Sequence, residues 1–184
     1  MSLKTASLQP SGPPAEKIAL YLLNKDLRVS DNSILHYLAI DKDHGFTRIL
    51  PVYVWNPVQI ETSGFLAPNE QSPYPEARSK VGGFWRTGPH RVNFTAEAVW
   101  NLKINLEQLG SGLIQRIGKP AEVVRHLIDH YEKQDPTIGA VWLTAGYATE
   151  EVKDQKALEK LCIRKEIDYK EWKDEKYLID DATT

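Results

Sequence analysis

Short apolar runs alternate with stretches of helical spacing from residue 17 to the end of the chain. Strands that alternate with helices in this way are typical of a parallel sheet covered by helices. The sequence therefore predicts an open, doubly wound, five-stranded parallel α/β fold with helices on both faces. Five runs have the length and composition of buried strands: KIALYLL (17–23), RILPVYVW (48–55), LIQRI (113–117), IGAVWL (138–143) and IDYKEW (167–172).

The segments between these runs carry apolar residues at helical spacing. Pro89 suits the first turn of the helix after the second run, and Cys162 lies on the apolar side of the last helix, where a core thiol is expected. Pro51 predicts that the second strand begins there or contains a bulge. The helical spacing covers four stretches, at 34–39, 92–109, 123–131 and 149–165.

Residues 56–88 form the longest connection and contain four prolines and four glycines. A connection of this length inside a compact domain tends to be functional or disordered. Phe84 and Trp85 follow a glycine pair within it. Their aromatic rings could cover a ligand pocket, dock another domain or fill the core beneath the connection.

Composition limits the available functions. The chain has 184 residues, 41% hydrophobic content, a net charge of −2 and one cysteine. This charge gives no broad basic surface for stand-alone nucleic-acid binding, and one cysteine excludes an internal disulfide framework. No apolar run approaches the roughly 20 residues that span a bilayer. Residues 1–16 lack a signal-peptide centre and are rich in Ser, Pro and Gly, so we expect a disordered start to a single intracellular, soluble domain at 17–181.

Familiar catalytic motifs are absent. The sequence contains no GxGxxG after the first run, no GxxxxGK[ST] and no GxSxG. His126 and His130 share a helix face but lack a third ligand nearby, so no metal site is expected. We therefore predict no catalytic residue in this chain.

A cluster of charges follows the first apolar run, in the stretch NKDLRVSDN (24–32). Ligands of doubly wound folds bind at the carboxyl ends of the strands, where this stretch lies. Ser30, Asp31 and Asn32 are all suitable N-caps for the helix that follows. Asp26 and Arg28 could pair locally or reach toward another surface.

The stretch LLNKDLRVSDN resembles the first-strand signature of the photolyase/cryptochrome family. GPHR (88–91), AEAVWNL (96–102) and the long connection SPYPEARSKVGGFWRTGPHR (72–91) are similar to DASH-type cryptochromes, in particular the fungal members. GKPAEVV (118–124) and WKDEKYLID (172–180) continue the resemblance in order. It covers residues 17–181.

The resemblance implies that this chain is the amino-terminal α/β domain, which binds an antenna chromophore, commonly 5,10-methenyltetrahydrofolate. It also implies that flavin adenine dinucleotide (FAD) and DNA are bound by a helical domain that this chain lacks. The full-length protein would then transfer an electron from light-excited flavin to damaged DNA, or act as a photoreceptor, whereas this chain alone would not be catalytic.

The resemblance further implies a ligand-binding glutamate in the first turn of the helix after the fourth strand. Glu150 and Glu151 match it. At 100° per residue, Glu151 points in the direction of the core positions further along the helix, so Glu151 is preferred. Tyr147 and Trp85 are expected as aromatic walls of the pocket.

The charged residues near the first strand are expected at the boundary with the helical domain. We assign this inter-domain role to Lys25, Asp26 and Arg28, and also to Arg91, which is placed to meet a phosphate or carboxylate. The alternative function is a stand-alone nucleotide-binding or protein-interaction α/β module of the universal-stress type.

Overall fold

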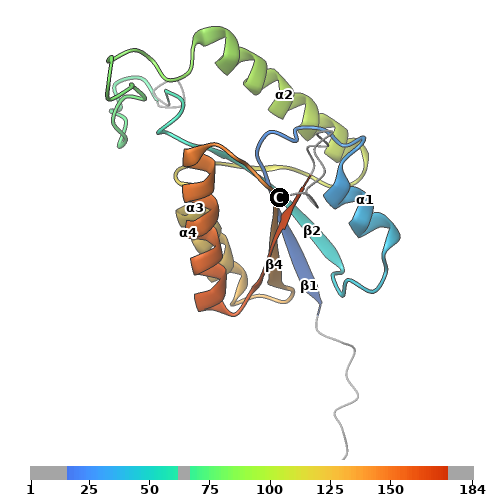
Figure 1. Cartoon of the computed structure of the whole chain (residues 1–184). Helices are drawn as coiled ribbons and strands as arrows, with labels where there is room; N and C mark the ends of the chain where they lie inside the picture. Colours follow the sequence, from blue (N-terminus) through green and yellow to red (C-terminus); the bar gives the residue numbers. More distant parts are fainter. Residues whose placement is uncertain (1–15, 62–66, 174–184) are drawn as a thin grey trace, which may run out of the picture.

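A computed structural model describes residues 16–61 and 67–173 of the protein. Its centre is a five-stranded parallel sheet in the order β3-β2-β1-β4-β5 (Figure 1). The strand order reverses beside β1, as expected for a doubly wound fold. The strands are β1 (Lys17–Leu23), β2 (Arg48–Trp55), β3 (Ile114–Ile117), β4 (Thr137–Thr144) and β5 (Asp168–Trp172).

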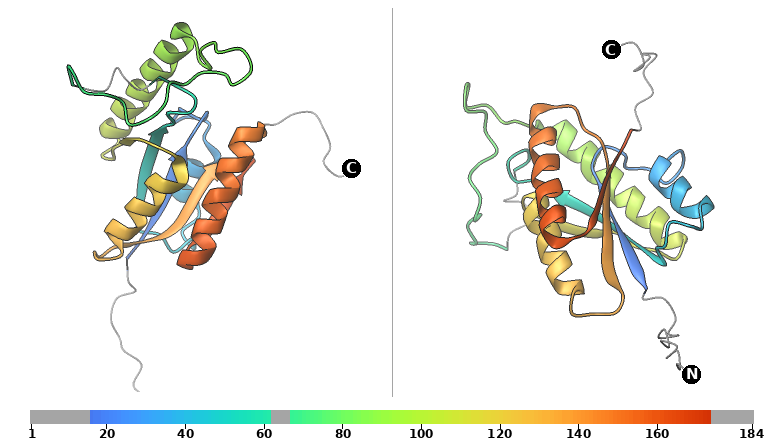
Figure 2. Two further views of the ribbon diagram at one scale, coloured as in Figure 1. Left: turned by 90° about the vertical axis from the view of Figure 1, so that its left-hand side faces the viewer. Right: turned by 60° about the horizontal axis from the view of Figure 1, so that its bottom comes forward.

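Helices cover both faces of the sheet (Figures 1 and 2). On one face, α3 and α4 pack on Leu20, Val52 and Val141, and on the other, α1 and α2 pack on Tyr21 and Trp142. Successive strand residues point to opposite faces, so one sheet supplies both cores. The helices are α1 (Ser33–Ile40), α2 (Pro89–Gln108), α3 (Pro120–Tyr131) and α4 (Thr149–Lys165).

The helix starts follow local chemistry. The side chain of Asn32 caps α1 by accepting a hydrogen bond from the N–H of Leu35 at 3.0 Å, so Asn32 is the N-cap among the three residues predicted for this role. Pro89 and Pro120 occupy the first turns of α2 and α3, where a missing N–H costs nothing. Asp31, just before the cap, has a positive φ of 52°.

Two details of the predicted elements were wrong. Pro51 lies inside β2 with an unbroken register to β1, and β3 pairs with β2 only from Val52 onward. Pro51 is tolerated because that part of β2 has an open edge, and the register shift occurs instead between Ile18 and Ala19, where β1 pairs with β4. Leu109 follows the end of α2 and is 68% exposed, whereas Cys162 is buried in the core as expected.

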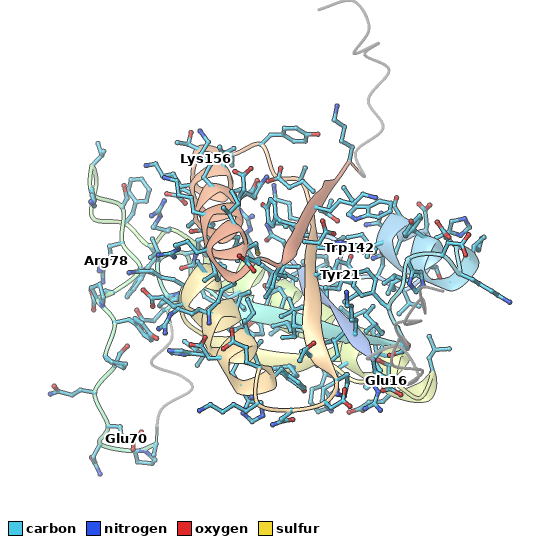
Figure 3. The ribbon with its side chains drawn as sticks, turned by 90° about the horizontal axis from the view of Figure 1, so that it is seen from below. Glu16, Tyr21, Glu70, Arg78, Trp142 and Lys156 are labelled. Carbon is cyan, nitrogen blue, oxygen red and sulfur yellow. The ribbon has the colours of Figure 1, made fainter. Side chains whose placement is uncertain are left out.

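The connection between β2 and α2 extends to the side of the sheet, and Glu70 and Arg78 lie on its outer part (Figure 3). An isolated antiparallel bridge joins Arg78 to Trp85, and Ala77 is buried at its base. The hydroxyl of Thr87 donates a hydrogen bond to the carbonyl of Gln59 at 2.7 Å, which ties the end of the connection to its start. Residues 1–15 of the segment 1–16 that was predicted to be disordered lie outside the described residues, as does the predicted domain end beyond residue 173.

Candidate functional site

A cleft lies over the carboxyl ends of β1, β2 and β4, at the point where the strand order reverses. It consists of a small inner cavity of about 80 Å³ and an outer cavity of about 500 Å³. The two cavities adjoin, because five residues line both. These are Asn24, Tyr53, Gln59, Ile60 and Glu151.

Glu151 is the acidic group shared by both cavities. Its side chain is 11% exposed, its Oε1 lies 2.7 Å from the Nζ of Lys25, and its Oε2 accepts a hydrogen bond from the N–H of Ala148 at 3.1 Å. Burial raises the pKa of Glu151, but the bonds from Lys25 and Ala148 outweigh it, so the pKa is lowered overall. Glu151 is therefore an ionised carboxylate at neutral pH, and it lies on the inward side of α4, where the helical periodicity predicted it.

Gly146 fixes the position of this carboxylate from the other side. A Cβ atom at Gly146 would lie 2.6 Å from the Oε2 and 2.8 Å from the Cβ of Glu151. Any larger residue would therefore displace Glu151. The N–H of Gly146 donates a hydrogen bond at 3.0 Å to the buried side chain of Gln155, which anchors the loop to α4.

Glu150 lines only the outer cavity. Its carboxylate forms an ion pair with Arg86, which comes from the end of the long connection. The pair joins that connection to the start of α4. Glu150 and Glu151 thus lie in one cleft but have different partners, and only Glu151 reaches the inner cavity.

The inner cavity contains polar groups that the sequence analysis missed. The side-chain amide of Asn56 donates to Asp154 at 3.2 Å, and burial raises the pKa of Asp154, an effect that the charge of Lys119 opposes. Asp154 is three residues after Glu151 and therefore lies on the same face of α4. Tyr53 forms a wall of both cavities, and burial raises its pKa to about 12 although Arg91 opposes this shift.

Two predicted aromatic residues are not among those that line these cavities. Tyr147 is 61% exposed. Trp85 lies under the guanidinium of Arg78, whose central carbon is 3.9 Å from the ring centre. Tyr53 supplies the aromatic wall instead, and the predicted ligand roles of Tyr147 and Trp85 gain no support from this geometry.

The residues assigned to the domain boundary divide into three groups. Asp26 is buried, and its carboxylate accepts hydrogen bonds from the hydroxyls of Tyr21 and Thr144 within this domain. Lys25 and Arg91 line the outer cavity, and Arg28 lines a separate groove beside α2. The inter-domain role stays a prediction for all four residues, and the side-chain hydrogen bonds of Asp26 within the described residues are made to Tyr21, Asn24 and Thr144 of this domain.

Within residues 16–61 and 67–173, no group of three or more His, Cys, Asp or Glu side chains could hold a metal ion. His126 contacts Arg125, and His130 contacts Gln134. No helix in the described part of the chain is long and apolar enough to cross a membrane.

Comparison with protein families matches residues 19–183 to the family described as DNA photolyase. Two fungal proteins provisionally named cryptochrome DASH are similar over most of the chain. The Gibberella zeae protein is 50% identical over 165 residues, which are 90% of this chain and 24% of its own length. The Neurospora crassa protein, whose name places it in mitochondria, is 41% identical over 169 residues, 91% of this chain and 23% of its own.

Solved structures share the fold. The crystal structure of a Synechocystis cryptochrome matches with a TM-score of 0.66 and 22% identity over 88% of this chain and 28% of that chain. A Sulfolobus tokodaii photolyase, described with two FAD molecules, matches with a TM-score of 0.58 and 19% identity over 85% of this chain and 29% of that chain. The chain spans about a quarter of the length of the fungal relatives.

Proposed function

This chain belongs to the DNA photolyase family, among its DASH-type cryptochromes, and we propose that it is the domain that binds a folate antenna chromophore. The observation that carries the proposal is the carboxylate of Glu151, which lies in a cleft at the reversal point of the sheet. Ligands of open α/β folds bind at this point. The outer cavity, at about 500 Å³, also has the volume of a small-molecule site.

The chemistry of the cleft suits a pterin ring. The amino group and a ring N–H of a pterin form an edge with two donors, which matches the two oxygens of an ionised carboxylate. In the present structure the ammonium group of Lys25 holds one oxygen of Glu151 at 2.7 Å, and the Lys25 side chain is 57% exposed. An incoming pterin would replace Lys25 as the partner of Glu151, while Tyr53 offers an aromatic wall.

The cleft does not suit the pyrophosphate of FAD. Dinucleotide sites place the pyrophosphate on free N–H groups of a glycine-rich turn after the first strand. Here the N–H of Asn24 donates to the carboxylate of Asp26 at 3.0 Å, so a negative group already occupies that turn. We therefore propose that FAD binds in another part of the family protein, the helical domain, and that this domain is the partner of the α/β domain.

The activity of the longer protein is a proposal of the same kind. It would transfer an electron from light-excited reduced flavin to a pyrimidine dimer, preferably in single-stranded DNA, or signal in response to blue light. The antenna, when bound, absorbs near-ultraviolet light and passes the energy to the flavin. The residues of this chain would hold the pterin and orient it, and they would not take part in the repair reaction itself.

Absorption of the purified protein tests the folate proposal. After incubation with 5,10-methenyltetrahydrofolate and removal of free ligand, we expect near-ultraviolet absorbance to remain with the wild-type protein. Glu151→Gln should retain much less folate, because the amide presents a donor to the two-donor edge of the pterin. Glu159→Gln, which alters an exposed carboxylate on α4 that lines neither cavity, is the matched control and should bind as the wild type does. A wild-type protein that retains no folate would overturn the proposal.

A further inference from the structure

The outer cavity carries charges of both signs. Three cationic side chains line it, from the end of β1, from the long connection and from the first turn of α2, and they face the two glutamates of α4. These cations are Lys25, Arg86 and Arg91.

Two of the three cations already have carboxylate partners. Lys25 pairs with Glu151, and Arg86 pairs with Glu150. Arg91 differs, because no carboxylate among residues 16–61 and 67–173 lies within ion-pair distance of its guanidinium. The cavity therefore contains one uncompensated positive charge, on the side formed by α2.

The position of Arg91 in its helix does not favour a positive charge. Arg91 lies in the first turn of α2, at the positive end of the helix dipole, where a cation is unfavourable. Its charge also acts on the buried hydroxyl of Tyr53, which lines the same cavity. The N-cap residue, Gly88, offers no side chain to the first N–H groups of α2. Both the guanidinium and the helix end would thus be stabilised by an anion in the cavity.

We propose that Arg91 binds the anionic tail of the ligand in this cleft, namely a carboxylate of the glutamyl tail of folate. This inference rests on the proposed folate function and extends it, since the tail subsite selects among pterins. Glu151 contacts the donor edge of the pterin ring, and Arg91 contacts the opposite, negatively charged end. A pterin without a glutamyl tail leaves Arg91 without a partner and should bind less tightly.

Two ligands and three proteins test the inference. The ligands are 5,10-methenyltetrahydrofolate and 5,10-methenyltetrahydropteroate, which has the same ring system without the glutamyl tail. The proteins are the wild type, Arg91→Gln and Arg164→Gln. Arg164 is the matched control, because it lies 13 residues beyond Glu151 on α4, about 20 Å along the helix axis, and lines a different groove.

Absorbance titrations measure the dissociation constant of each protein for each ligand. We expect Arg91→Gln to weaken binding of the folate about tenfold, which corresponds to about 1.4 kcal/mol. Its affinity for the pteroate should equal that of the wild type, and Arg164→Gln should leave both affinities unchanged. Equal weakening of both ligands by Arg91→Gln, or no weakening of either, would overturn the inference while the folate function remains.

A phosphate is the other anion that this chemistry could accept, so flavin mononucleotide and riboflavin are titrated in parallel. If flavin mononucleotide bound in an Arg91-dependent manner and riboflavin did not bind, Arg91 would still be an anion-binding residue. Its ligand group would then be a phosphate and not the carboxylate of a glutamyl tail. A wild-type protein that binds none of the four compounds would overturn both this inference and the folate function. The two failures are therefore distinguishable.

Discussion

The hydroxyl of Tyr21, in the middle of β1, donates a hydrogen bond to the carboxylate of Asp26, five residues further along the chain. The amide of Asn32 donates to the same hydroxyl at 2.8 Å, and the hydroxyl of Thr144 donates to Asp26 at 2.5 Å. This buried network joins the turn after β1 to the cap of α1 and to the end of β4. The network thus fixes the carboxyl ends of β1 and β4, over which the ligand cleft lies.

Removal of the Tyr21 hydroxyl should destabilise the protein. Tyr21→Phe leaves Asp26 and Asn32 each without one buried partner, and we expect the free energy of unfolding to fall by about 1–3 kcal/mol. Urea denaturation measures the loss. Tyr131→Phe is the matched control, because the Tyr131 hydroxyl has no hydrogen-bond partner within the described residues. Equal stability of the two variants would contradict a structural role for the network.

The stabilising effect of Glu151 should depend on pH. Its pKa is lower in the folded protein than in the unfolded chain, chiefly because Lys25 and the N–H of Ala148 outweigh the effect of burial. A carboxylate of this kind stabilises the fold above its unfolded pKa of about 4.3, and the contribution is lost as the pH falls through the folded value. Glu151→Gln should therefore be less stable than the wild type by about 1 kcal/mol at pH 7.

The difference between Glu151→Gln and the wild type should shrink as the pH falls through the folded pKa of Glu151, which lies below the unfolded value of about 4.3, since both side chains are then neutral. Urea denaturation at pH 7, pH 5 and pH 3.5 follows the change. Glu97→Gln, which alters an exposed carboxylate on α2, controls for the general effect of acid. A stability difference that stays constant over this pH range would show that the charge of Glu151 is not the stabilising feature.

Local patterns in the sequence predicted most of the fold. The bounds of β1, β2 and α4 agree with the structure, since their apolar spacing is strong and unbroken. The spacing also placed Glu151 correctly, because Leu158 and Cys162 on the same face are buried. Leu109 misled the prediction because it continues the apolar spacing of α2 by one position, beyond the last helical residue.

The composition of the cleft could not be predicted in the same way. Lys25 and Glu151 are far apart in the sequence, as are Arg86 and Glu150, and no local pattern states which cation meets which carboxylate. Asp26 was expected to pair locally with Arg28 or to reach another surface, and the resemblance assigned it to the domain boundary. It is buried instead, since two hydroxyls and a backbone N–H that converge only in the folded chain satisfy its oxygens.

Cys162 should be unreactive in the folded protein. Its side chain is buried in the core beneath α4, and burial, with a contribution from the charge of Asp168, raises its pKa to about 11. The thiol therefore stays protonated at pH 8, and the thiolate is the reactive form. We expect Ellman's reagent to react slowly with the native protein and rapidly in 8 M urea. Rapid, complete reaction without denaturant would contradict the buried position of Cys162.

Gly146 should be required for both stability and ligand binding. In Gly146→Ala, the new Cβ would lie 2.6 Å from the Oε2 of Glu151, closer than real contacts allow, so the glutamate must move. The movement would weaken its bonds to Lys25 and Ala148 and turn the carboxylate away from the pterin edge. We expect unfolding to become easier by about 1–3 kcal/mol, as for other overpacked sites.

Gly112→Ala separates this steric effect from the general effect of replacing a glycine in a loop. A Cβ at Gly112 meets nothing within 4 Å, and its φ lies outside the left-handed region. Gly112→Ala should therefore keep the stability and folate affinity of the wild type, while Gly146→Ala loses both. Urea denaturation and absorbance titration of the two variants measure the contrast. If Gly146→Ala bound folate as tightly as Gly112→Ala, the position of Glu151 would not determine folate affinity. Glu151 would then not be the main contact of the pterin.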